Sequence, residues 1–181
     1  MGRKVKRWLG VVLAVLFVVL CYLLIHAANV RKNPRADDSV MVAGLANALS
    51  NFASEYGRLP DPGRYWLETE GPEGAELLQI LLGESGPTTT PQNPRLIPFL
   101  NIREARGKRG GLYYSAEDDR PYALYDIRGR PLRVALRTTD EKEFSVRYSG
   151  QDLVLQNRDF AVWALGEDGV EGTEDDLKSW E

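Results

Sequence analysis

The sequence predicts an α+β protein, because one helical pattern is followed by a series of short strand-like runs. Three features lead to this class: an uncharged apolar run, an apolar stripe of helical spacing, and extended runs separated by turn residues. We expect an N-terminal transmembrane helix and an amphipathic helical spine packed on a small antiparallel β-sheet. A chain of 181 residues is long enough for one such domain.

The apolar run over residues 8–28 predicts a transmembrane helix. It contains no Asp, Glu, Lys or Arg, and its 21 residues, at about 1.5 Å each, match a bilayer core of roughly 30 Å. A cleaved signal peptide fits less well, because Ile25 or His26 would stand where a small residue is required. A lipoprotein cut before Cys21 fails for a similar reason, since a leucine precedes it. We therefore expect a retained anchor.

The charges beside this run predict its orientation. Four bases precede it and three follow it closely, so the positive-inside rule places the N-terminus in the cytoplasm. We expect a single-pass protein of the inner (cytoplasmic) membrane with a periplasmic domain. The expected organisation is a basic cytoplasmic N-terminus (1–7), the transmembrane helix (8–28), a linker or helix continuation (29–38) and an extracytoplasmic domain (39–181).

A helical pattern begins at residue 40. Apolar residues recur at three- and four-residue steps and form one stripe: Val42, Leu45, Leu49, Phe52 and Tyr56. A glycine at 57 caps this pattern and a proline at 60 prevents its continuation. The stripe is expected to cover the protein's own sheet, with an intersubunit contact as the alternative.

Downstream, a shorter helix is predicted over residues 74–83, followed by a loop rich in Pro, Gly and Thr. Strand-like runs then alternate with turn residues, which indicates an antiparallel arrangement. These runs cover residues 111–115, 121–127, 131–138, 143–148 and 159–165.

Catalytic chemistry lacks its usual residues. The only histidine, His26, and the only cysteine, Cys21, both lie in the apolar run, and no phosphate-binding loop or zinc-ligand spacing is present. A carboxylate pair for glycoside hydrolysis is the remaining enzymatic alternative, although no pair is marked out.

The net charge is −3 and the first four bases precede the apolar run, so the rest of the chain is more acidic still. We expect no enzyme and no nucleic-acid partner.

The C-terminal stretch "GEDGVEGTEDDLKSW" holds six carboxylates and one base. Either water screens a flexible acidic tail or a cation lies among the acids. Glycines between the acids would let backbone carbonyls turn toward a common centre. Oxygen ligands without His or Cys favour calcium over zinc. From spacing alone both alternatives stay open, although the tryptophans that flank the stretch favour an ordered loop.

The segment "WALGEDGVEGTEDDLKSW" resembles the C-terminal calcium loop of the major pseudopilins of type II secretion. "GLANALSNFASEYGRLPD" resembles the end of that family's long helix, and "DIRGRPLRVAL" a worn form of one of its strand motifs. The resemblance implies a pseudopilin-like fold whose last loop binds one Ca²⁺. Carried over by position, the ligands would be the side chains of Asp168 and Asp176, the carbonyls of Leu165, Val170 and Thr173, and additionally Asp175.

The N-terminal segment departs from that family. Its precursors carry Phe and Glu after the cleaved glycine, whereas this chain has Val11 and Val15 after Gly10. The resemblance therefore does not extend to the processing site or to the glutamate that fixes filament registry by pairing with a neighbouring amine in the membrane. The resemblance implies a non-enzymatic, membrane-anchored pseudopilin-like structural component of a type II secretion or type IV pilus-like system. We expect other pilin-like or secretion-system proteins as partners and weak self-association. The alternative is a non-polymerising, membrane-anchored, calcium-dependent binding or regulatory module of the cell envelope.

Overall fold

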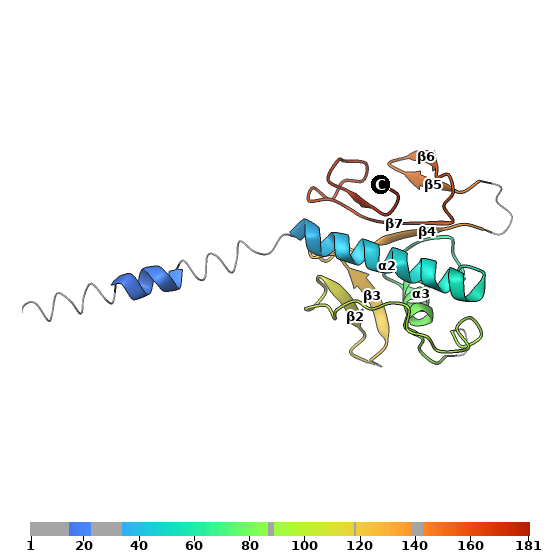
Figure 1. Cartoon of the computed structure of the whole chain (residues 1–181), viewed down its shortest axis with the longest axis horizontal. Helices are drawn as coiled ribbons and strands as arrows, with labels where there is room; N and C mark the ends of the chain where they lie inside the picture. Colours follow the sequence, from blue (N-terminus) through green and yellow to red (C-terminus); the bar gives the residue numbers. More distant parts are fainter. Residues whose placement is uncertain (1–14, 23–33, 87–88, 118, 139–142) are drawn as a thin grey trace, which may run out of the picture. The chain divides into compact units, whose positions relative to one another are not determined.

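The computed structural model describes residues 15–22, 34–86, 89–117, 119–138 and 143–181 (Figure 1). The chain divides into two compact units, Met1–Pro34 and Arg35–Glu181. The second unit carries all the strands described and the candidate site, and the following paragraphs concern it unless the first is named.

The first unit corrects the predicted membrane anchor. Its described part is a helix over residues 15–22. Within the described ranges, no helix combines the length and the apolar character needed to cross a membrane. The predicted transmembrane helix over residues 8–28, the fold class that includes it and the single-pass inner-membrane localisation are therefore wrong on this finding. The rest of that segment and the predicted cytoplasmic terminus lie outside the described residues.

Helix α2 (Pro34–Tyr56) is the longest element of the second unit. Four residues of the predicted stripe, Val42, Leu45, Leu49 and Phe52, are at most 4% exposed, and the fifth, Tyr56, is half-buried. A proline suits the first turn of a helix because its missing N–H has no intrahelical partner there. At the other end Gly57 adopts φ 67°, and its N–H donates to the Ala53 carbonyl at 2.8 Å. This left-handed residue ends the helix.

The other elements are short and follow one another along the chain. They are β1 (Trp66–Glu68), α3 (Pro72–Leu82), β2 (Gly111–Tyr114), β3 (Pro121–Tyr125), β4 (Arg133–Leu136), β5 (Ser145–Tyr148), β6 (Gln151–Val154), β7 (Phe160–Ala164) and β8 (Leu177–Lys178). The strands form a four-stranded sheet in the order β1-β4-β7-β8 and two hairpins, β2-β3 and β5-β6. Every strand pair is antiparallel. The architecture is α+β with three sheets, not the single small sheet that the sequence predicted.

Buried Thr69 connects the end of β3 to the start of β4. Its hydroxyl donates to the Leu124 carbonyl at 2.6 Å and accepts the Leu132 N–H at 2.9 Å. The Leu132 N–H also donates to the Leu124 carbonyl at 3.3 Å, so the hydroxyl joins both partners of this direct hydrogen bond. Pro131, which cannot donate a hydrogen bond, forms only an isolated bridge with Tyr125. The two edges of strand β4 pair with β1 and β7.

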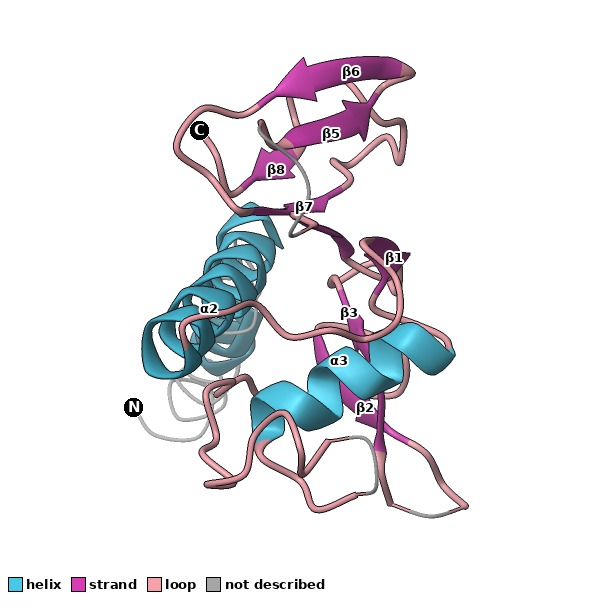
Figure 2. Ribbon diagram, turned by 90° about the vertical axis from the view of Figure 1, so that its right-hand side faces the viewer, coloured by secondary structure: helices cyan, strands magenta, loops and turns pink. Residues whose placement is uncertain are grey.

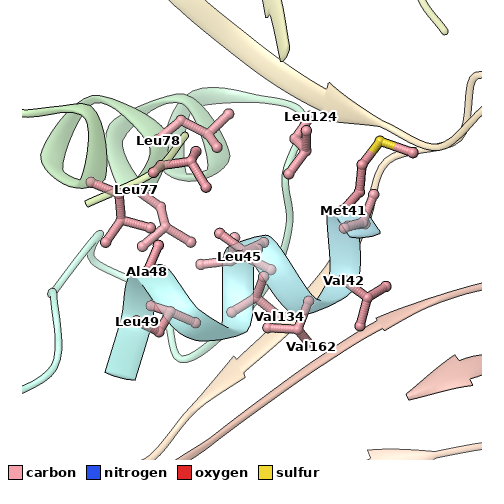
Figure 3. Close-up of a cluster of buried hydrophobic side chains, with 14 of the residues drawn as sticks. Met41, Val42, Leu45, Ala48, Leu49, Leu77, Leu78, Leu124, Val134 and Val162 are labelled. Carbon is pink, nitrogen blue, oxygen red and sulfur yellow. The ribbon is translucent and has the colours of Figure 1, made fainter. Parts of the chain in front are cut away.

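The four-stranded sheet has a different partner on each face. One face packs against α2 and α3 in the main core, drawn in Figure 3, where Leu45, Leu77 and Val134 meet. The other face carries Ala135, Ala161 and Trp163, which pack against residues of the β5-β6 hairpin. Figure 2 shows β7 between α2 on one side and this hairpin on the other. The alternation of inward and outward residues along β4 and β7 follows from the period of two in a strand.

We expect Thr69→Val to lower the free energy of unfolding by about 1–3 kcal/mol, because the Leu124 carbonyl and the Leu132 N–H would each lose a buried hydrogen bond. The substitution keeps the shape of the side chain, and Thr69→Ser keeps the hydroxyl as a matched control. Urea denaturation measures the difference. Equal stability of the valine and serine variants would contradict the bridging role of this hydroxyl.

Candidate functional site

The acidic stretch forms an ordered loop, residues 165–176, between β7 and β8. Those two strands pair antiparallel, with Trp163 opposite Lys178, and so hold both ends of the loop together. Gly169 and Gly172 have φ of 71° and 98°, a region that glycine enters without steric cost. The chain can therefore turn back on itself between the acids. The loop, red in Figure 1, lies near the first turns of α2.

Asp176 closes the loop from inside. Its side chain is only 2% exposed. One oxygen accepts the Gly166 N–H at 2.8 Å, and the other accepts the Gly172 N–H at 2.8 Å and the hydroxyl of Tyr148. The resemblance implied a metal ligand at this position, whereas the structure gives both oxygens protein donors. Asp176 is thus the internal anchor of the loop.

Four of the six residues expected to hold calcium converge on one point. Thr173 does so through its hydroxyl, whereas its carbonyl, the expected ligand atom, accepts the Asp176 N–H at 3.3 Å. Thr173 Oγ1 lies 2.6 Å from Asp175 Oδ1, 3.1 Å from the Val170 carbonyl and 3.4 Å from Asp168 Oδ1. One hydroxyl proton can serve only one of these three acceptors. The oxygens therefore outnumber the donors that face them, and two of them belong to carboxylates. Such a set of hard oxygens is what Ca²⁺ prefers in proteins.

Backbone donors orient the two carboxylates of this cluster. Asp175 Oδ2 accepts the N–H groups of Glu167 and Asp168, and Asp168 Oδ1 accepts the Val170 N–H at 2.8 Å. The hydrogen bond from Thr173, together with those from the backbone, lowers the pKa of the half-buried Asp175 carboxyl. Both side chains are held in place before any ion arrives.

The sixth expected ligand, the Leu165 carbonyl, contacts a positively charged side chain of the protein instead. It accepts a hydrogen bond from Arg130 Nη2 at 3.0 Å. Calcium takes about 6–8 oxygens, so the cluster of Asp168, Val170, Thr173 and Asp175 fits the ion if water completes the shell. In the part of the chain that the structure describes, no group of three or more His, Cys, Asp or Glu side chains could hold a metal. The fit is therefore to a site of low ligand charge, which favours weak binding.

Glu171 holds the loop to the sheet, a role that the sequence pattern did not reveal. Its Oε1 accepts from Arg133 Nη1 at 2.6 Å and from Trp163 Nε1 at 2.9 Å. Its Oε2 accepts the Ser149 N–H at 3.0 Å, at the tip of the β5-β6 hairpin. Burial alone would raise the pKa of Glu171, but the hydrogen bonds from Trp163, Ser149 and Arg133 outweigh it and hold the pKa below its usual value.

Tyr148 connects the loop to the same hairpin. Its ring lies against Trp163 and Trp180, with ring centroids 6.3 and 5.6 Å away. Burial, and then the hydrogen bond to Asp176, raise the pKa of this phenol. The tryptophans that flank the acidic stretch were expected to favour an ordered loop, and their packing against the Tyr148 ring gives the physical reason.

Comparisons of the chain with protein-family models, with curated proteins and with solved structures found no match. The resemblance to major pseudopilins thus rests on the quoted residues alone.

The lowered pKa of Glu171 predicts a pH-dependent contribution to stability. This contribution is fully present above the unfolded value of about 4.3 and is lost as the pH falls through the lower folded pKa. Glu171→Gln should therefore be less stable than wild type near neutral pH, and the difference should shrink in acid. Urea denaturation between about pH 3 and 7 measures it. A difference that does not change with pH would contradict this account.

Proposed function

We propose that the chain is a non-enzymatic, pseudopilin-like structural component of a type II secretion or type IV pilus-like system, whose C-terminal loop binds Ca²⁺. The observation that carries the proposal is the convergence of the Asp168, Val170, Thr173 and Asp175 oxygens around one hydroxyl. Bound calcium would supply the positive charge that these oxygens lack. The assignment of the larger system rests on the resemblance, which is an analogy at the level of motif and fold.

The partners of this component would be other pilin-like or secretion-system proteins, and self-association would be weak. The face of α2 turned away from the core supports a role in contacts. Val40 on this face is 68% exposed, and small or polar side chains at Ala43 and Asn47 are exposed beside it. The surplus of acid over base gives no support for a nucleic-acid partner.

A second candidate is a calcium-dependent binding or regulatory module that does not polymerise. One observation favours it: a groove of about 600 Å³ between β1, β4 and the β5-β6 hairpin. Tyr65 and Trp66 line this groove and are 48% and 46% exposed. Exposed aromatic residues in a groove are typical of contact sites.

Calcium should stabilise the purified full chain, because the oxygen cluster forms only in the folded state. At a hundredfold excess over the dissociation constant the gain would be about 2.7 kcal/mol. Asp168→Asn combined with Asp175→Asn should abolish the response, whereas Glu174→Gln, an exposed acid of the same loop outside the cluster, should keep it. Thermal unfolding with calcium and with chelator measures the effect. Identical unfolding in both conditions would exclude the calcium site.

Cysteine crosslinking should separate the structural component from the binding module. With Val40→Cys in a Cys21→Ser background, we expect mixed crosslinks to co-produced pilin-like proteins and only traces of homodimer. Leu45→Cys, whose position is fully buried, serves as the control that should not react. Efficient ladders of self-crosslinked multimers without other pilin-like proteins would contradict weak self-association. Absence of every crosslink would favour the binding module.

A further inference from the structure

Arg130 is oriented by a buried carboxylate in the turn between β3 and β4. Asp126 is only 1% exposed, and its Oδ2 accepts from Arg130 Nε at 2.9 Å. Its Oδ1 accepts the backbone N–H groups of Arg128 and Arg130, both at 2.8 Å. A charge removed from water to this degree needs a fixed partner. The pair therefore sets the direction of the guanidinium.

The far side of this guanidinium lies against the entrance of the C-terminal loop. Nη2 donates to the carbonyls of Leu165 and Gly166, at 3.0 and 2.5 Å. Nη1 lies so close to Gly169 that a side chain at that position would come within 2.6 Å of it. A planar guanidinium can bridge such acceptors because its donors have a fixed geometry. Residues 165–169 thus surround a positive charge that belongs to the protein.

The same turn is tied to α2. Arg128 Nη1 donates to Asp38 Oδ2 at 3.2 Å, and the Ile127 N–H donates to Asp38 Oδ1 at 2.8 Å. Asp38 is itself 2% exposed. The turn therefore fixes Arg130 relative to the helix as well as to the loop, so the guanidinium cannot leave the loop without disturbing buried ion pairs.

We propose that Arg130 is the resident cation of the C-terminal loop: it holds residues 165–169 closed without metal and confines Ca²⁺ to the oxygens of Asp168, Val170, Thr173 and Asp175. The Leu165 carbonyl accepts Arg130 at 3.0 Å, which puts a positive charge beside the oxygen that a metal would have to approach. A guanidinium beside the cluster also repels a second cation and weakens its binding. The calcium half of this inference rests on the proposed function, whereas the closure of residues 165–169 does not.

Arg130→Met tests both the closure of residues 165–169 and the effect on calcium binding. It approximately keeps the length of the side chain and removes its charge and its hydrogen-bond donors. In chelator, cleavage after Glu167 by a glutamyl endopeptidase should be slow in wild type and fast in the variant. Calcium, titrated by calorimetry, should bind the variant about tenfold more tightly, since a repelling charge is removed and the Leu165 carbonyl is freed. A merely structural arginine would instead loosen calcium binding together with the loop.

Matched variants keep the test decisive. Arg64→Met removes an exposed arginine that pairs with Glu73 at 3.0 Å, outside the loop and the turn, and it should leave calcium affinity and cleavage unchanged. If Arg130→Met fails to fold because Asp126 is left buried and unpaired, Asp126→Asn with Arg130→Met removes both charges and should show the same two effects. Unchanged cleavage, or weaker calcium binding in the variants, would overturn the inference. If neither wild type nor variants bind calcium, the calcium part of the proposed function fails, and the cleavage rates alone decide the role of Arg130.

Discussion

The closure of the C-terminal loop by the buried Asp176 carboxylate is the constraint on which the geometry of the site depends. By accepting the N–H groups of Gly166 and Gly172, at 2.8 Å each, it brings two points of the loop to one side chain. The segment between them must fold back, and left-handed Gly169 allows that turn. This folding places Asp168 and Val170 beside the following Thr173.

The loop does not need a single bound ion to offset the negative charges of its six acids. Asp176 and Asp175 accept backbone N–H groups, and Glu171 is paired with Arg133. Asp176 and Glu171 are thus anchored through both oxygens, whereas Asp175 is anchored through Oδ2 alone. Its Oδ1 shares the Thr173 hydroxyl with Asp168, and Asp168 and Asp175 form an outward pair. This division resolves the choice between a flexible acidic tail and an ordered loop in favour of the loop, and it limits any metal to the outward pair.

Local sequence patterns were enough to predict the helix and most strands. They were not enough to predict how the strands are arranged in sheets or which residues contact the loop. The stripe that ends at Tyr56 and the turn residues between extended runs act over short distances, and the corresponding helix and strands are present. By contrast, the contacts of Thr69 with β3 and β4 and of Arg130 with Leu165 join residues 35 to 63 positions apart. No local pattern encodes such partners. The membrane anchor was inferred from the length of an uncharged apolar run and its flanking bases, and no helix of the described ranges meets the requirements for a span.

The central claim is that the loop is closed by the protein's own donors and charges. Amide hydrogen exchange of Gly166 and Gly172, measured on the full chain in the presence of chelator, tests it most directly. The account predicts slow exchange at both amides, close to that of the N–H groups paired between β4 and β7, because Asp176 accepts from both. Exchange at the rate of an unstructured peptide would contradict it and would make the order of the loop a consequence of bound metal.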